Sequence, residues 1–208
     1  GGKKGAYNLK IAMVFDGLQI GGVERVGADY AKMLCQMGHD VTIVNLKPKA
    51  NEMKKEFPES CSWIEFYYSR KFAPEQYAQL VKKGFVGTCI YQLAEILLSG
   101  FDLILKTILR VRYNLTFDLI IAFSGHFNDL NFVANSLLKN QKKLCWLHGA
   151  LYSYLLISDG YYRLYNRIKN LVVLVSDAQE EVLAYNKSLY VNINKLYNPT
   201  FIKERKID

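Results

Sequence analysis

The 208-residue sequence lacks several motifs that mark common kinds of site. It has three histidines and four cysteines, and no cysteine pair forms a C-x-x-C, so a zinc centre is not indicated. Gly17 and Gly22 have the spacing of P-loop glycines, but Val23 follows where that loop needs lysine. The first apolar run is not followed by G-x-G-x-x-G, and the second ends "VNL" without an acidic residue. The two standard nucleotide-binding turns are therefore excluded.

Signals for export, membrane crossing and serine hydrolysis are also missing. The start "GGKKGAY" has no apolar core of a signal peptide. The apolar stretch "ILLSGFDLILKTIL" is interrupted by Asp102 and Lys106, and we expect it to be too short and too charged to span a membrane. Ser124 lies in "AFSGH" and lacks the first glycine of a nucleophile elbow. The scattered cysteines are typical of buried free thiols, which fits a reducing compartment.

What is present is an ordinary globular composition with a basic balance. Half of the residues are hydrophobic and 22% are charged, so a packed core is expected. The net charge of +8 is compatible with an anionic partner or simply with a soluble surface. Nucleic acid is not favoured, because the aromatic residues do not cluster with the basic ones.

Short apolar runs alternate with segments of helical periodicity along the chain. Because the strands do not alternate in polarity and are separated by helices, they predict an α/β, Rossmann-like three-layer domain with a mainly parallel sheet. We expect helix from 73 to 112 in two or three pieces, broken near Gly84–Gly87 and near Gly100. The seven expected strands are "LKIAMVF", "DVTIVNL", "CSWIEFY", "FDLIIAF", "KLCWLH", "NLVVLV" and "NKLYN".

Ligands of an open α/β sheet bind beyond the carboxyl ends of its strands, so the residues that follow each strand are the candidates. Ser124 and Asn128 are placed to hydrogen-bond a hydroxyl, and His126 and His148 each follow a strand. His39 follows the helix-ending Gly38 and is expected to serve a turn. The candidate stretches are Asp16–Arg25, Ser124–Asn128, His148–Tyr152, Ser176–Gln179 and Asn198.

The first of these stretches contains two adjacent glycines, Gly21 and Gly22, at a strand-to-helix junction. Glycine allows a ligand to approach the backbone closely, and a helix N-terminus offers free N–H groups and a positive dipole end. A phosphate or carboxylate would suit this junction, and Arg25 would add positive charge. A purely structural turn explains the same pattern, so both interpretations stay open.

The stretch "IAMVFDGLQIGGVERVGADYAKMLCQMGHDVTIV" resembles the opening of family 4 retaining glycosyltransferases, which have the two-domain GT-B fold. "KLCWLHG", "NLVVLVSDAQEEVL" and "NKLYNPTFI" are similar to later segments of the same N-terminal domain, in the same order. The resemblance covers most of residues 9–202 and is weakest over about 50–115. It implies a transferase of bacterial type that moves a hexose from a nucleotide-sugar to a glycan or lipid-linked acceptor in cell-surface polysaccharide synthesis.

The resemblance also implies roles for residues. Gly21 and Gly22 would lie against the donor phosphates with Arg25 beside them, and His148 would contact the transferred sugar as the catalytic residue. Together with Ser124, His126 and Asn128 as acceptor-binding residues, they make up the expected site. No metal and no cofactor besides the nucleotide-sugar substrate is expected.

The resemblance divides the chain into three expected parts. Residues 1–8 would be a disordered tail or a remnant of cloning, 9–198 a single domain, and 199–208 the start of a linker to an absent nucleotide-sugar domain. We expect such a fragment to be inactive alone. The rival interpretation is a non-catalytic α/β binding or scaffold module that has kept a GT-B-like cleft.

Residues 77–117 are both apolar and basic, and two interpretations remain open. They fit an amphipathic segment on an anionic membrane, and equally a helix pair packed on the sheet. We expect a cytoplasmic protein, which the first interpretation would place at the inner face of the cell membrane.

Overall fold

The structure is a computed structural model, which describes residues 7–69, 79–80, 82–149, 153, 155, 159–174, 180 and 191–199. Strands and helices alternate over these residues, as the periodicity predicts. In chain order the elements are β1 (Lys10–Phe15), α1 (Gly22–Gln36), β2 (Asp40–Asn45), the 3₁₀ turn η1 (Lys54–Glu56), β3 (Ser62–Glu65), α3 (Gly84–Tyr113), β4 (Thr116–Ala122), α4 (Phe127–Ala134), β5 (Lys139–Trp146), α6 (Asp159–Ile168), β6 (Asn170–Val173) and β7 (Asn192–Lys195).

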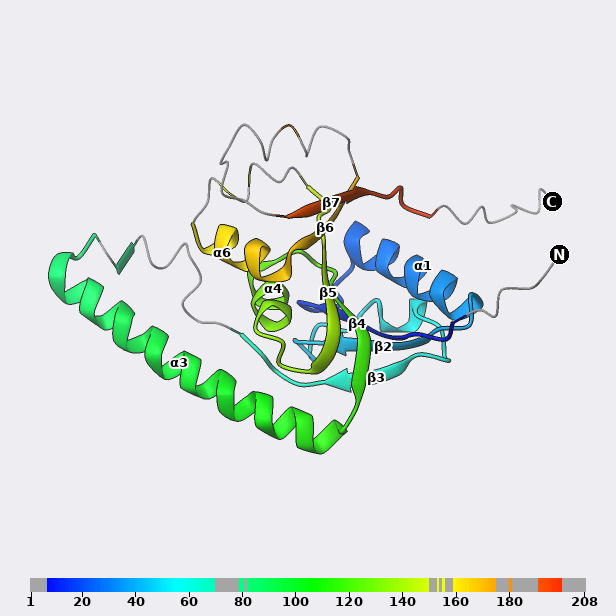
Figure 1. The fold of residues 1–208 in the computed structure, drawn as a ribbon, viewed down its shortest axis with the longest axis horizontal. Helices are drawn as coiled ribbons and strands as arrows, with labels where there is room; N and C mark the ends of the chain where they lie inside the picture. The colour runs from blue at the N-terminus through cyan, green and yellow to red at the C-terminus, as the bar shows by residue number, and fades with distance from the viewer. Residues whose placement is uncertain are drawn as a thin grey trace.

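The seven strands form one parallel sheet in the order β3-β2-β1-β4-β5-β6-β7. After their first residue, β1 and β2 are buried throughout, because helices cover both faces of the sheet. Figure 1 shows α1 on one side of the sheet and α4 and α6 on the other. The predicted fold class, an α/β Rossmann-like domain with a parallel sheet, is confirmed.

Tight packing fixes the position of α1 against the sheet. A Cβ on Gly27 would lie 2.6 Å from the ring of Phe15, so the helix can approach β1 this closely only through a bare backbone. The rings of Tyr30, Phe123 and Trp146 fill the layer beneath α1, with centroids of Tyr30 and Trp146 4.3 Å apart. These contacts hold the N-terminus of α1 beside the carboxyl end of β1.

Several predicted boundaries are confirmed and others are wrong. Gly38 follows α1 with φ of +87° and ends the helix as predicted, and His39 accepts a hydrogen bond from Leu9 N in the following turn. The break expected at Gly100 does not occur, because a single glycine costs a helix only about 1 kcal/mol and no proline follows. Strand β7 begins at Asn192, two residues earlier than expected, and ends at Lys195, three residues earlier. The helix expected over 177–190 lies outside the described residues except for Glu180.

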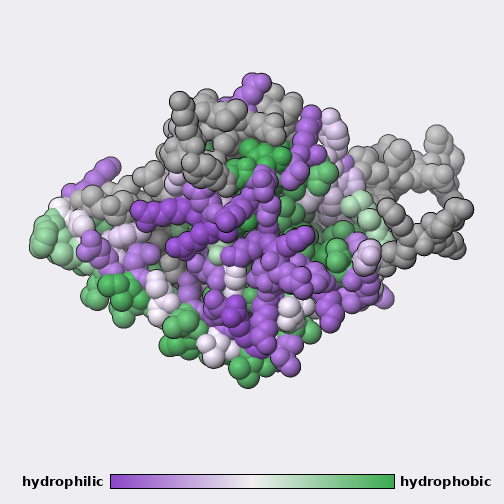
Figure 2. All heavy atoms as spheres, in the orientation of Figure 1, coloured by the Kyte–Doolittle hydropathy of each residue, from purple (hydrophilic) through white to green (hydrophobic). Residues whose placement is uncertain are grey.

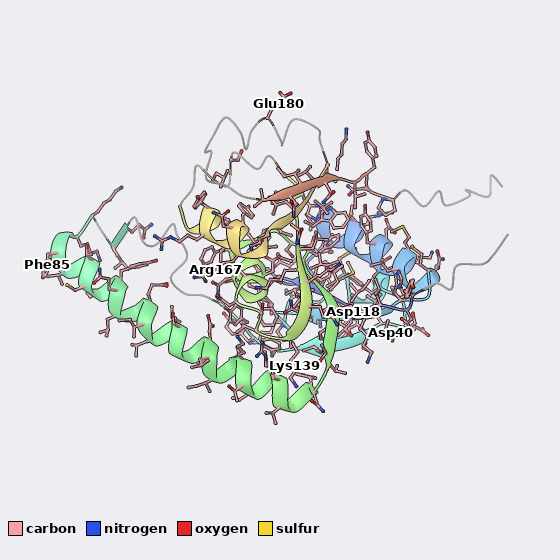
Figure 3. All side chains as sticks on the ribbon, in the orientation of Figure 1. Asp40, Phe85, Asp118, Lys139, Arg167 and Glu180 are labelled. Carbon is pink, nitrogen blue, oxygen red and sulfur yellow. The ribbon has the colours of Figure 1, made fainter. Side chains whose placement is uncertain are left out.

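Helix α3 is the largest departure from the sequence prediction. It runs unbroken for 30 residues with a mean hydropathy of 1.4 in its most apolar window, of which 6% is buried. By length and composition it could cross a membrane, so the expectation that this stretch is too short and too charged to do so was wrong. Figures 1 and 3 show its first turns, marked by Phe85, far from the sheet, and its last turns close to β4 and Lys139.

Candidate functional site

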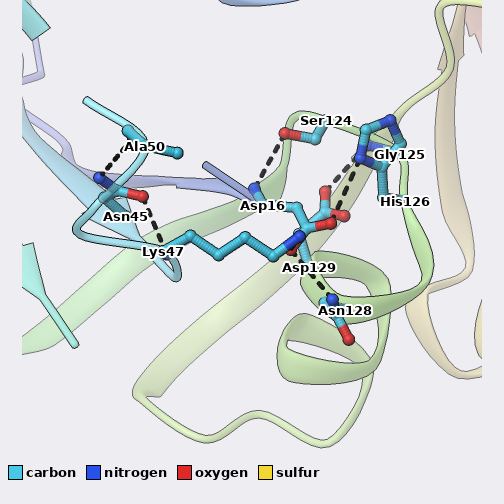
Figure 4. Close-up of polar contacts among 9 residues, drawn as sticks. All are labelled: Asp16, Asn45, Lys47, Ala50, Ser124, Gly125, His126, Asn128 and Asp129. Atoms are coloured by element: carbon cyan, nitrogen blue, oxygen red, sulfur yellow. Dashed lines mark hydrogen bonds and ion pairs between the residues drawn. The ribbon is translucent and has the colours of Figure 1, made fainter. Parts of the chain in front are cut away.

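The carboxyl ends of three neighbouring strands bring a cluster of polar side chains together (Figure 4). Asp16 follows β1, Lys47 follows β2, and residues 124–129 follow β4 and begin α4. Because β1 lies between β2 and β4 in the sheet, Asp16 occupies the centre of the cluster. The sheet order therefore produces the cluster from segments up to 113 residues apart (16 to 129) in the sequence.

Asp16 is held from several sides. Its Oδ1 lies 3.0 Å from the Nζ of Lys47 and accepts a hydrogen bond of 3.0 Å from the Nδ2 of Asn128. Its Oδ2 lies 3.4 Å from the Nδ1 of His126, and its backbone N–H donates to the Oγ of Ser124 at 3.0 Å. The Asp16 side chain is 8% exposed, whereas that of His126 is 54% exposed. His126 is therefore the member of the pair that solvent or a ligand can reach.

The pairing sets the charges of both groups. Burial alone would raise the pKa of Asp16, but hydrogen bonds from His126, Asn128 and Lys47 outweigh it, and the pKa is lowered. The hydrogen bond to Asp16 raises the pKa of His126, supported by the negative charges of Asp129 and Glu24. Asp16 is thus a carboxylate at neutral pH, and His126 carries a positive charge to higher pH than a free histidine.

A second carboxyl, Asp129, lies fully buried behind the pair. Its Oδ2 accepts the backbone N–H of Gly125 at 2.9 Å, while its Oδ1 has no hydrogen bond of ordinary geometry to any of the described residues. Burial raises the pKa of Asp129 to about 7, an effect that the charge of His126 only partly offsets. Near neutral pH this carboxyl is therefore poised between its protonated and ionised forms.

Gly125 is required by the turn that positions this cluster. Its φ is +68°, and a Cβ would lie 2.9 Å from the carbonyl oxygen of Trp146 on β5. We expect Gly125→Ala to destabilise the fold by about 1–3 kcal/mol, since alanine is strained at this φ and the backbone oxygen cannot move away. Urea denaturation measures the change. An unaltered unfolding free energy would contradict the close turn.

The junction before α1 is exposed rather than covered by this domain. Gly21 caps the helix in an extended conformation without a side-chain hydrogen bond, and Gly22 is exposed as the first helical residue. A Cβ on Gly22 would meet nothing within 4 Å. Neither backbone strain nor packing within the described residues therefore demands glycine at this position.

Charges of both signs surround the same helix end. Glu24 lies in the first turn, with a carboxylate oxygen that a Cβ on Gly21 would touch, and Arg25 is exposed next to it. The negative charge of Glu24 acts on His126, which shows that the helix N-terminus and the β4 turn are neighbours. The free N–H groups of the first turn thus face the same region as the Asp16 cluster.

His148 follows β5 and is oriented by the backbone. Its Nε2 lies 2.8 Å from the carbonyl oxygen of Phe123, and because that oxygen can only accept, Nε2 carries the proton. Burial lowers the pKa of His148, and the positive charge of nearby His126 contributes to the same effect. The ring is therefore neutral at pH 7 and presents Nδ1 as a hydrogen-bond acceptor.

The structure brings most of the predicted residues to one edge, in different roles. His126 is accessible, and Asn128 donates a hydrogen bond to Asp16. Ser124 is 3% exposed, and its hydroxyl accepts the backbone N–H of Asp16 instead of facing solvent. Residues 150–152 and 176–179 of the candidate stretches lie outside the described residues. Sequence reasoning placed Asp16 in a candidate stretch but gave it no role of its own, and it did not include Lys47, although both follow buried strands.

Cavities lie at both edges of the sheet. One of about 610 Å³ opens beside Lys47 and is lined by residues 47–50 and by Tyr67. Another of about 490 Å³ lies at the opposite edge and includes Lys10, His39 and Asp40. We place the candidate site at the first edge, because parallel sheets bind ligands beyond the carboxyl ends of their strands. Within the described ranges no three His, Cys, Asp or Glu residues are grouped as a metal site would require.

Comparison with solved structures finds proteins of similar fold. The chain is similar to Anabaena Alr3699/HepE in complex with UDP and glucose, with a TM-score of 0.53 and 16% identity over 93% of this chain and 45% of the other. It is also similar to a glycosyltransferase from Rickettsia africae, with a TM-score of 0.51 and 20% identity over 92% of this chain and 43% of the other. The chain shares its α/β, Rossmann-like fold with part of each of these GT-B glycosyltransferase structures.

A third solved structure has a similar fold, and in each comparison the match covers only part of the other chain. An alpha-glucosyltransferase in complex with UDP and a 13-mer DNA matches with a TM-score of 0.52 and 13% identity, over 93% of this chain and 43% of the other. The chain spans less than half the length of these enzymes. No family model matches the sequence, and no curated protein gives a significant match.

Proposed function

We propose that the chain is the acceptor-side, N-terminal domain of a retaining glycosyltransferase. The enzyme would transfer a hexose from a nucleotide-sugar to a glycan or lipid-linked acceptor, in the synthesis of cell-surface polysaccharide. The observation that carries the proposal lies at the carboxyl edge of the sheet. There the exposed N-terminus of α1, which begins with Gly22, lies next to the charged cluster around Asp16 and His126. Structures of similar fold contain UDP or UDP-glucose. A second domain, as in those structures, would supply the rest of the donor site.

Gly22 is the donor-side residue of this proposal. No atom of the described part of this domain fills the space beside the Cα of Gly22. The lack of a side chain at this position is therefore best explained by a bound ligand that occupies this space. The free N–H groups and the dipole of α1 favour an anion, and a sugar diphosphate would be such a group. Arg25 adds a positive charge one turn on, against the opposing charge of Glu24.

His126 is the polar group that faces the acceptor. Its Nδ1 is engaged by Asp16, which leaves the Nε2–H of the charged ring to donate to an acceptor hydroxyl or a phosphate oxygen. Asp16 itself already binds Lys47 and Asn128, so it positions His126 and does not serve as a free base. The cluster therefore orients an acceptor and adds positive charge near the departing phosphate.

His148 is proposed to contact the transferred sugar. Its neutral ring, fixed by the carbonyl of Phe123, offers Nδ1 as an acceptor for a sugar hydroxyl. A buried hydrogen bond of this kind contributes about 1 kcal/mol or more, and more where it strengthens in the transition state.

We expect His148→Ala to lower kcat by about tenfold in the full-length protein, because one transition-state hydrogen bond is lost. The measurement is release of UDP and formation of product in a screen of nucleotide-sugars that includes UDP-glucose. His39→Ala, at the opposite edge of the sheet, is the matched control and should leave turnover unchanged. Equal turnover of His148→Ala and wild type would contradict the assigned role. Binding of nucleotide-sugars without turnover of any of them would favour a non-catalytic module.

A further inference from the structure

Helix α3 carries a broad apolar surface that the described part of the protein leaves uncovered. Eleven large apolar side chains on it are between 49% and 84% exposed. Figure 2 shows hydrophobic atoms gathered along the lower left rim, where α3 runs in Figure 1. We call these eleven residues the α3 face: Phe85, Val86, Ile90, Leu93, Ile96, Leu97, Phe101, Leu103, Ile104, Ile108 and Val111.

The α3 face is one continuous stripe. At about 100° per residue its members fall within a sector about 160° wide that runs the length of the helix, roughly 45 Å. The helix positions between them within this sector hold no charged residue, and include Cys89, Gly100 and Thr107. Exposed apolar areas of this extent are rare on soluble monomers and mark an interaction surface.

The opposite side of the C-terminal half of α3 is packed on the domain. Asp102 is 7% exposed and accepts a hydrogen bond of 3.2 Å from the hydroxyl of Tyr68, and Leu109 is 4% exposed in the core. Arg110 donates to the backbone oxygen of Ser136 at 3.0 Å. These contacts fix the orientation of the helix, so that the α3 face points away from the sheet.

The attachment of α3 excludes a simple crossing of a bilayer. Its last turn joins β4 through only Asn114 and Leu115, and Leu109 is part of the same core as the sheet. A helix whose second half is packed on the α/β domain has too little free length to span about 30 Å of hydrocarbon. The α3 face can therefore lie along a membrane surface, whereas the helix as a whole does not pass through it.

The charges around the stripe are basic. Lys82 and Lys83 are exposed directly before the helix, and exposed Arg112 borders the stripe at its other end. The two acidic residues of α3 lie away from the stripe: Asp102 is buried against Tyr68, and Glu95 lines a cavity together with Arg167. An apolar stripe with basic ends and no acidic border is the pattern of an interfacial helix on anionic lipid.

We propose that the α3 face docks the protein on an anionic membrane. The width of the stripe distinguishes this partner from a second copy of the chain, because a helix pair buries only a narrow seam of about two residues in seven. The apolar side chains would enter the headgroup region, and Lys82, Lys83 and Arg112 would contact lipid phosphates at its edge. This inference does not depend on the proposed enzyme activity.

Vesicle flotation of the full-length protein tests the proposal, with phosphatidylcholine vesicles prepared with and without phosphatidylglycerol. We expect flotation with the anionic vesicles, and at least about tenfold less of it with Leu97→Asp/Ile104→Asp, since two charges replace apolar contacts. Both positions are more than 60% exposed, so folding should be unaffected, which circular dichroism verifies. Met37→Asp, which charges an exposed apolar residue after α1, is the matched control and should float as wild type does.

Charge reversal tests the contribution of the basic residues separately from that of the apolar α3 face. Lys82→Glu/Lys83→Glu should lower binding to anionic vesicles by about tenfold or more, while weak binding to neutral vesicles stays the same. Three results would overturn the proposal. The first is that the wild-type protein does not float, and the second is that Leu97→Asp/Ile104→Asp floats as well as the wild type. The third is that the wild-type protein forms a dimer, does not bind vesicles, and becomes monomeric when it carries these two substitutions. The last result would assign the α3 face to self-association.

Discussion

We expect Gly22→Val to lower kcat/KM for the nucleotide-sugar by about 10- to 100-fold in the full-length protein, equivalent to losing one charge-assisted hydrogen bond. A Cβ at this position meets nothing within 4 Å of its own domain, so the valine side chain fits the isolated fold. It would instead fill the space that the donor phosphates are proposed to occupy, and it would screen the first N–H groups of α1. Steady-state kinetics with UDP-glucose and other nucleotide-sugars measures the effect.

The matched control for this change lies on the same helix. Gln36→Val places the same side chain at an exposed residue, at the last position of α1 and the amino edge of the sheet. Both variants should melt close to the wild-type temperature, and Gln36→Val should keep wild-type kinetics. Normal turnover by Gly22→Val would show that no ligand approaches this turn.

A second large effect is expected at Asp129, as a dependence of stability on pH. The pKa of this carboxyl rises from 3.8 in the unfolded chain to about 7 in the folded one. Well below pH 4 both states hold the proton, so there is no penalty for burying a charge. As pH rises toward 7, the unfolded state releases its proton while the folded state keeps it, so stability falls. A shift of about three pKa units corresponds to about 4 kcal/mol, reached near pH 7.

Asp129→Asn removes this penalty, since an amide oxygen can still accept the N–H of Gly125. We expect the unfolding free energy of the variant, relative to wild type, to increase steadily from about pH 4 to about pH 7 and to level off above. Urea denaturation at a series of pH values measures the difference. Asp40→Asn, at an exposed carboxyl, is the control and should give a difference that does not follow this rise. A flat difference for Asp129→Asn as well would contradict the buried, poised carboxyl.

Much of the fold follows from local patterns in the sequence. The runs that became β1 and β2 are short, apolar and not alternating, which indicates strands covered on both faces. Gly38 ends α1 at the predicted position, because glycine readily adopts the positive φ that follows many helices. The course of α3 could not be predicted in this way, because one glycine at position 100 weakens a helix without stopping it.

The candidate site was predicted less completely than the fold. Residues that follow a strand can be read from the sequence, and His126, Asn128 and Gly22 were found by that rule. The pairing of Asp16 with Lys47 depends on β1 and β2 being neighbours, and that of Asp16 with His126 depends on β1 and β4 being neighbours. This order is a property of the whole sheet. The burial of Ser124 and Asp129 likewise depends on how α4 packs.

The most direct test is a crystal structure of the full-length protein with a bound nucleotide-sugar such as UDP-glucose. The proposal predicts a phosphate oxygen within about 3 Å of a backbone N–H at the start of α1, with the sugar near His148. A diphosphate held elsewhere, with Gly22 still open to water, would contradict it.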